Sequence, residues 1–298
     1  MNIKFYITAF ALLFISTVFA EDNKEITGFQ NPESVIAYKN HLFVSNTGLK
    51  LEPLAKDGDG YISMLSREDG KIIELKFIAD LNSPKGMFIK KGILYVADVD
   101  KVLGFDIATK KKVFEADLSP YGVSYANDIT RAFRGMFVSA TLKNAIFKIK
   151  TNGKIKELKI KGAFYGANGL DRKRVGKLAI ANFGDQNQSN GSFGKIGLIT
   201  KKYKEFHKSG IYDGIIRKCG KLYITDWVNQ NENKGRLIVS KRNSKKGLNE
   251  IQLEHPIGGP SDLFADKKTK LLWIPSMTEN KIIAIPFSDL KVKTPIQK

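Results

Sequence analysis

The chain has little of what covalent cross-links require. Its 298 residues include one cysteine, Cys219, and three histidines, His41, His207 and His255. A single cysteine cannot form an internal disulfide, so stability must come from packing. Cys219 lies just before an apolar run, which predicts a buried small side chain rather than a nucleophile. The histidines are scattered and no serine–histidine–aspartate spacing is present, so we expect structural or surface positions for all three.

Long apolar runs are missing after the first 20 residues. Within residues 1–20, Lys4 precedes the apolar stretch 7–18 and a small-residue cleavage site ends at Ala20, which is the pattern of a secretory signal peptide. An uncleaved anchor helix is the alternative, but the stretch is short for a membrane span of about 20 residues. We expect cleavage after Ala20 and an exported protein, periplasmic or secreted. Residues 21–298 contain no linker and no apolar segment long enough to cross a membrane, so they are expected to form one domain.

Acidic residues are scarce compared with basic ones. The chain has 30 aspartates and glutamates against 49 lysines and arginines, which gives a formal net charge of +19. Lysine pairs such as Lys90–Lys91 and Lys201–Lys202 fall at expected hairpin turns. The simplest interpretation is a solvated surface, although such a surface also attracts anionic partners such as phospholipid headgroups or envelope polymers. Nucleic-acid binding is not expected, because export opposes it and no basic motif is interleaved with aromatic residues.

What the chain does contain is a repeat. A polar anchor residue, a residue that is most often small and an apolar residue occur in sequence, and a β-type apolar run follows a few residues later. The anchors of the six units are Glu33, Lys85, Asn127, Asn168, Asp213 and Ser261. Repeats of roughly 40–50 residues made of short strands are typical of β-propellers.

The units predict an all-β, six-bladed β-propeller with four strands per blade. Only the sixth unit lacks a clear fourth segment, and residues 24–29 could supply it and close the ring. No stretch after the leader keeps the 3.6-residue periodicity of a helix. Two loop-like stretches, 184–194 and 228–235, fall between the second and third strands of their units. We expect them to form long excursions on one face.

Four anchors carry oxygen ligands, and the propeller would bring them together on its axis. They are two carboxylates and two amides, Glu33, Asn127, Asn168 and Asp213. Oxygen atoms of this kind suit Ca²⁺, which accepts about 6–8 of them. No histidine or cysteine falls in the ring, so zinc is not expected. The alternative is that these residues only bind backbone groups in turns.

The pattern resembles the calcium-dependent six-bladed propellers of the gluconolactonase, regucalcin (senescence marker protein) and luciferin-regenerating-enzyme group. Members place a glutamate in the first blade, asparagines in the third and fourth, and an aspartate in the fifth around a catalytic calcium. Glu33, Asn127, Asn168 and Asp213 match this set residue by residue. The resemblance implies a Ca²⁺ cofactor, a lactone or related ester as substrate, Asn127 also in contact with it, and Asp213 as the nucleophile or general base.

Lys85 departs from that pattern, because an ammonium in the ring would repel a cation. It could instead grip an anionic group of the substrate, or replace the metal by neutralising Glu33 or Asp213. Asp262, beside the ring, could be a further ligand. Two functions therefore remain open: an exported calcium-dependent hydrolase acting on a small molecule, and a non-catalytic propeller that binds a ligand, an envelope polymer or a protein. We expect a monomer in either case.

Overall fold

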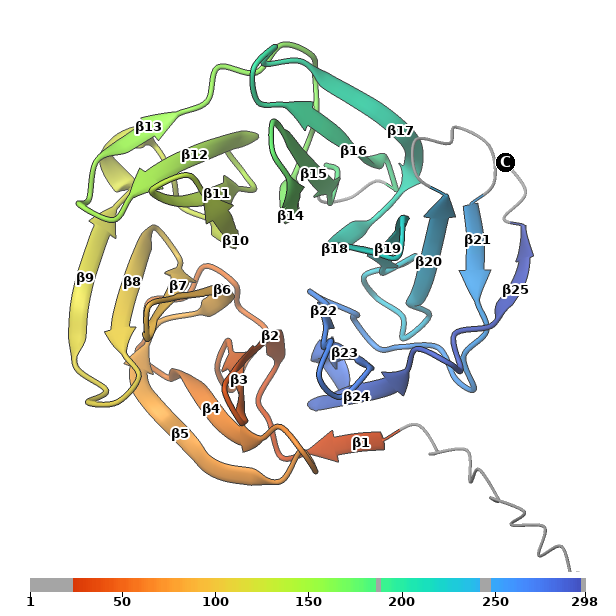
Figure 1. Cartoon of the computed structure of the whole chain (residues 1–298), viewed down its shortest axis with the longest axis horizontal. Helices are drawn as coiled ribbons and strands as arrows, with labels where there is room; N and C mark the ends of the chain where they lie inside the picture. The colour runs from red at the N-terminus through yellow and green to blue at the C-terminus, as the bar shows by residue number, and fades with distance from the viewer. Residues whose placement is uncertain (1–23, 186–188, 242–247, 296–298) are drawn as a thin grey trace, which may run out of the picture.

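The structure, a computed structural model, describes residues 24–185, 189–241 and 248–295, so the expected signal peptide lies outside the described residues. Six antiparallel sheets surround a central axis as the blades of a propeller (Figure 1). Blade one contains β2 (Pro32–Tyr38), β3 (His41–Asn46), β4 (Gly60–Ser66) and β5 (Ile72–Leu81). Blade two contains β6 (Pro84–Lys90), β7 (Ile93–Asp98), β8 (Lys101–Asp106) and β9 (Lys112–Asp117). Blade three contains β10 (Ala126–Ala132), β11 (Gly135–Ala140), β12 (Ala145–Lys150) and β13 (Ile155–Glu157).

The other three blades complete the ring, and the first strand of each blade lies nearest the axis (Figure 1). Blade four contains β14 (Ala167–Arg174), β15 (Lys177–Asn182), β16 (Gly191–Gly197) and β17 (Tyr203–Gly210). Blade five contains β18 (Tyr212–Lys218), β19 (Lys221–Asp226), β20 (Arg236–Lys241), β21 (Leu248–Ile251) and β25 (Val292–Pro295). Blade six contains β22 (Phe264–Ala265), β23 (Leu271–Ser276), β24 (Lys281–Pro286) and β1 (Lys24–Thr27). The expected fold is therefore confirmed. Within the described part of the chain, no helix has the length and hydrophobicity of a membrane span.

The two ends of the described chain tie the ring together. β1 pairs with β24, from Lys24 opposite Ala284 to Thr27 opposite Lys281, so the predicted closure of blade six by the N-terminal strand is confirmed. β25 crosses from blade six to the outer edge of blade five, where Asn249 lies opposite Pro295. This fifth strand was not predicted, and four strands per blade hold only for the other five blades.

Close packing of the inner strands explains the recurring small residue after each anchor. A Cβ added at Gly86 would lie 2.5 Å from the Asp128 Cα, and one at Gly169 would lie 2.3 Å from the Asp213 carbonyl oxygen. The backbones of neighbouring inner strands thus leave no room for a side chain at these positions. The apolar third residue of each unit is buried between blades, as Leu170 and Ile215 are. The core is therefore a set of layers between adjacent blades.

Two local predictions need correction. Cys219 is exposed, not buried, because it occupies the two-residue turn between β18 and β19. Both turn residues have positive φ, 47° at Cys219 and 77° at Gly220, as a tight hairpin requires. The loop placed at 184–194 is shorter than expected, since β16 begins at Gly191. The loop at 228–235 lies between β19 and β20, as predicted.

Candidate functional site

A cavity of about 360 Å³ lies at the end of the axis where the inner strands begin. Its polar part is formed by anchor residues from four blades: Glu33, Lys85, Asn127 and Asp213. Its wall comes mainly from the loops after the second strands and includes Leu51, Pro53, Phe183, Trp227 and Met277. The cavity thus combines a polar ring with a largely apolar wall, which is the usual composition of a small-molecule site.

A β-bulge directs each of these anchors toward the axis. The register of the inner pair shifts around Glu33, Lys85, Asn127, Asn168 and Asp213, always at the start of the inner strand. A bulge bends its strand and re-aims the side chain, which is why bulges are common beside functional sites.

In three blades a hydroxyl on the second strand accepts the backbone N–H that follows the anchor. Ser45 Oγ accepts from Ser34 N at 3.0 Å, and Ser139 Oγ and Thr225 Oγ1 do the same in blades three and five at 2.9 and 2.7 Å. These bonds satisfy a donor that the bulge removes from the ladder, so they hold the anchors in place.

Three of the four expected ligand side chains have a buried oxygen without a hydrogen-bond partner. The atoms are Glu33 Oε2, Asn127 Oδ1 and Asn168 Oδ1. The fourth residue, Asp213, accepts a hydrogen bond on Oδ2 from Trp227 Nε1 at 3.1 Å and another from the Asn168 side chain. Leaving buried polar atoms unpaired is costly, and such atoms in a folded protein call for an explanation such as a bound ion.

Negative charge accumulates at this ring. Burial, followed by repulsion from Asp213 and Asp262, raises the pKa of Glu33 well above its usual value. Burial and the nearby Asp262 raise the pKa of Asp213 to about 8. Asp262 is itself raised to a pKa of about 6 by burial, although hydrogen bonds from Ser34 and from the Leu263 backbone oppose this rise. A cation at the ring would relieve the repulsion that these shifts express.

Lys85 is held by other groups than the ring carboxylates. Its Nζ donates to Pro53 O and Ser83 O at 2.7 Å each and to Ser83 Oγ at 3.2 Å. The ammonium also lies 5.0 Å from the centre of the Tyr125 ring. Burial lowers the pKa of Lys85 to about 8, against the attraction of Glu33 and Asp98. With all three hydrogens donated to these oxygens, Lys85 forms no direct ion pair with Glu33 or Asp213.

The donor set fits a hard cation better than a transition metal. Among residues 24–185, 189–241 and 248–295, no three histidine, cysteine, aspartate or glutamate side chains are grouped to hold a metal. A cation at the ring would instead use two carboxylates and two amide oxygens, and three of these four groups have a buried oxygen without a partner. Hard oxygen ligands of mixed charge are what Ca²⁺ accepts.

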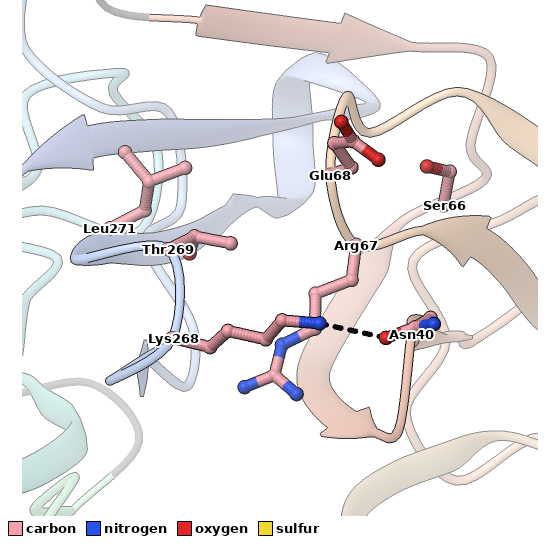
Figure 2. Close-up of a pocket in the computed structure, with 7 residues that line it drawn as sticks. All are labelled: Asn40, Ser66, Arg67, Glu68, Lys268, Thr269 and Leu271. Carbon is pink, nitrogen blue, oxygen red and sulfur yellow. Dashed lines mark hydrogen bonds between the residues drawn. The ribbon is translucent and has the colours of Figure 1, made fainter.

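A second hollow, of about 580 Å³, lies at the other end of the sheets between blades one and six (Figure 2). Arg67 donates to the buried Asp266 at 2.7 and 2.5 Å. Lys268 Nζ donates to Asn40 Oδ1 at 2.7 Å (Figure 2). Because Arg67 and Lys268 already bind groups of the neighbouring blade, these residues connect blades one and six. His41, His207 and His255 do not line the central cavity.

Comparison with known proteins supports the fold and no closer relationship. No protein-family model matches the chain, and no curated protein matches it in sequence. Its structure is similar to hydrazine synthase from Kuenenia stuttgartiensis, with a TM-score of 0.62 and 16% identity over 88% of this chain and 76% of that one. It is also similar to virginiamycin B lyase from Staphylococcus aureus, with a TM-score of 0.61 and 16% identity over 93% of this chain and 89% of that one.

A chain of a nidogen/laminin complex gives a TM-score of 0.63 and 14% identity, covering 82% of this chain and 92% of that one. Propellers named as enzymes and propellers named as parts of protein complexes therefore both share this fold. At such identities the likeness shows the propeller alone, and function has to be argued from the site.

Proposed function

We propose that this protein is an exported calcium-dependent hydrolase that acts on a lactone or related ester at the central cavity. The observation that carries the proposal is the set of unpartnered buried oxygens of Glu33, Asn127 and Asn168. Glu33 and Asn127 line the cavity with Asp213, and the Asn168 side chain is hydrogen-bonded to Asp213. The sequence resemblance to the gluconolactonase group names the same four residues. The chemistry that a bound Ca²⁺ would supply here is Lewis-acid polarisation of an ester carbonyl.

Asp213 is the residue best placed to handle a proton or to attack the substrate. Trp227 Nε1 and the Asn168 side chain fix its carboxylate by hydrogen bonds. Its pKa of about 8 lies near the range that suits a general base in neutral solution. Asp213 would accept a proton from a water molecule directed at the ester carbon, or would attack that carbon itself.

The wall of the cavity favours a small substrate with an apolar side. Leu51, Phe183, Trp227 and Met277 line the space above the ring. Lys85 has no hydrogen left to donate to a substrate, so we assign it the task of holding the loop that carries Pro53. A non-catalytic propeller, the alternative, predicts an ion pair between Lys85 and the ring, and the geometry of Lys85 does not support one.

Calorimetric titration of residues 21–298 with Ca²⁺ tests the cation site. We expect micromolar or tighter binding, weakened at least about 100-fold by Asp213→Asn, because one charged ligand is lost. The control is Asp226→Asn in the same blade, whose carboxylate pairs with Arg236 and does not line the cavity. No binding by the wild type would refute the site.

Hydrolysis is tested separately on sugar lactones, aryl esters and phosphotriesters. We expect the wild type to hydrolyse a lactone or ester. Chelation of Ca²⁺ should abolish this activity, and the Asp213→Asn variant should not show it. Calcium binding with no turnover of any of these substrates would keep the cation site and contradict the hydrolase.

A further inference from the structure

The face opposite the cavity carries unpaired positive charge in every blade. Neighbouring strands are antiparallel, so the turns after the first and third strands of each blade all lie at the end away from the cavity. Each blade has an exposed basic residue in or beside such a turn: Lys39, Lys91, Arg134, Lys202, Lys221 and Lys267. Within the described residues, none of the six is part of an ion pair. We call this surface the basic turn face.

Some lysines on the cavity side are instead paired with carboxylates. Lys56 pairs with Asp100 at 2.5 Å, Lys234 pairs with Glu232, and Lys281 pairs with Glu25 at 2.9 Å. Loops around the cavity therefore mix charges of both signs. Among the described residues, the excess of basic over acidic side chains lies mainly at the opposite end of the sheets.

Three large apolar side chains protrude from the basic turn face. Phe133, Val175 and Ile199 are 69%, 91% and 87% exposed, and they occupy the turns β10–β11, β14–β15 and β16–β17. A Cβ added at Gly176 would lie 4.0 Å from Ile199 Cδ1, so the two turns of blade four are adjacent. Exposing large apolar side chains to water is unfavourable, and exposed apolar patches are typical of surfaces that bind a membrane or another protein.

The apolar tips are embedded in positive charge. The Arg134 guanidinium lies 5.2 Å from the centre of the Phe133 ring. Arg172 reaches from blade four to the Arg131 carbonyl oxygen in blade three at 3.4 Å. Burial, followed by repulsion from Lys150 and Arg172, lowers the pKa of Lys148. The turns of blades three and four that were placed at this end contain no acidic residue among those described.

We propose that the basic turn face docks on an anionic phospholipid surface, with Phe133, Val175 and Ile199 entering the headgroup region. A basic surface alone would suit any polyanion, but apolar tips surrounded by lysine and arginine suit the boundary between headgroups and acyl chains. Docking in this orientation directs the cavity away from the lipid. The inference does not depend on whether the cavity is catalytic.

Flotation with lipid vesicles tests the proposal on residues 21–298, because the apolar leader could bind lipid by itself. We expect binding to phosphatidylcholine vesicles that contain one third phosphatidylglycerol, weak binding to pure phosphatidylcholine, and release at high salt. Each neutralised basic residue should weaken partitioning about fivefold, so Arg134→Gln, Lys202→Gln and Lys221→Gln together should weaken it on the order of 100-fold.

The apolar tips are tested by combining Phe133→Ser, Val175→Ser and Ile199→Ser. We expect this variant to partition roughly tenfold more weakly, because less apolar surface enters the lipid. The matched control combines Lys50→Gln, Lys143→Gln and Lys234→Gln, exposed lysines of the cavity-side loops. It lowers the net charge by the same amount and should partition like the wild type. Melting temperatures verify that all variants are folded.

Three results would overturn the proposal. The first is no binding to the anionic vesicles. The second is an equal loss in the control variant, which would mean that only net charge matters. The third is normal vesicle binding by the serine variant combined with displacement by free polyphosphate, which would identify a soluble polyanion as the partner.

Discussion

Replacing Asp213 by asparagine is expected to stabilise the folded protein at pH 8 when no divalent cation is present. Removal of a buried polar residue usually destabilises a protein, but here the carboxylate is repelled by Glu33 and Asp262. Asparagine keeps an oxygen that can accept the Trp227 hydrogen bond and removes the negative charge. The gain should vanish in saturating Ca²⁺, which stabilises only a protein that binds it.

The sign and the size of the effect follow from the pKa. Asp213 has a pKa of about 8 when folded, against an ordinary 3.8. A carboxyl group whose pKa is raised by folding contributes stability below pH 4, and that contribution is lost as the pH rises to about 8. A shift of this size corresponds to about 6 kcal/mol at full ionisation. Asp262, whose pKa is raised to about 6, adds to the loss of folding stability between pH 4 and pH 6.

Thermal unfolding between pH 4 and pH 8 in a chelating buffer is the assay. The wild type should lose stability steadily across this range, and Asp213→Asn should melt roughly 10 °C higher than the wild type at pH 8. Lys85, whose pKa is lowered to about 8, acts in the opposite direction above that pH, so the scan stops there.

The control for this assay is Asp226→Asn. The Asp226 carboxylate accepts hydrogen bonds from Arg236 and from the Ile211 backbone. Replacing this charged partner of Arg236 by an amide should destabilise the folded protein by roughly 3 kcal/mol. A wild-type melting temperature that does not change between pH 4 and pH 8, or an Asp213→Asn variant that melts below the wild type at pH 8, would refute the account of the ring.

Two further substitutions test other parts of the structure. Lys85→Met should raise the affinity for Ca²⁺ roughly tenfold in calorimetry, because a positive charge near the ring is removed, whereas Lys143→Met should not change it. Gly169→Ala should lower the free energy of unfolding by about 2 kcal/mol in urea, because the new Cβ would lie 2.3 Å from the Asp213 carbonyl oxygen. The control Gly153→Ala, where a Cβ meets nothing within 4 Å, should cost only about 1 kcal/mol from its positive φ.

The regular part of the fold could be predicted because the packing of inner strands leaves a signature in the sequence. A small residue such as Gly86 or Gly169 is required where two inner backbones meet, and an apolar residue follows it into the layer between blades. β25 (Val292–Pro295) could not be found in this way. It is four residues long, and its pairing with β21 depends on a contact between distant parts of the chain.

The ring of anchors was also predictable, but the structure that supports it was not. The repeat alone places Glu33, Asn127, Asn168 and Asp213 on one axis. A signal for their support was present, since a hydroxyl precedes the last residue of the second strand at Ser45, Ser139 and Thr225. The acceptors of Lys85 had no such signal, because Pro53 belongs to a loop whose path over blade two is set by tertiary contacts.

The net charge of +19 does not oppose a cation at the ring, because of where the topology puts the charges. Anchors lie at the start of each inner strand and the basic turns lie beyond its end. An inner strand of seven residues, such as β18 (Tyr212–Lys218), spans on the order of 20 Å. That distance exceeds the screening length of about 8 Å at physiological ionic strength, so the turn lysines hardly affect the ring through solvent. Lys85 is the one buried lysine near Glu33 among the described residues, so it alone should set the electrostatic penalty for cation binding.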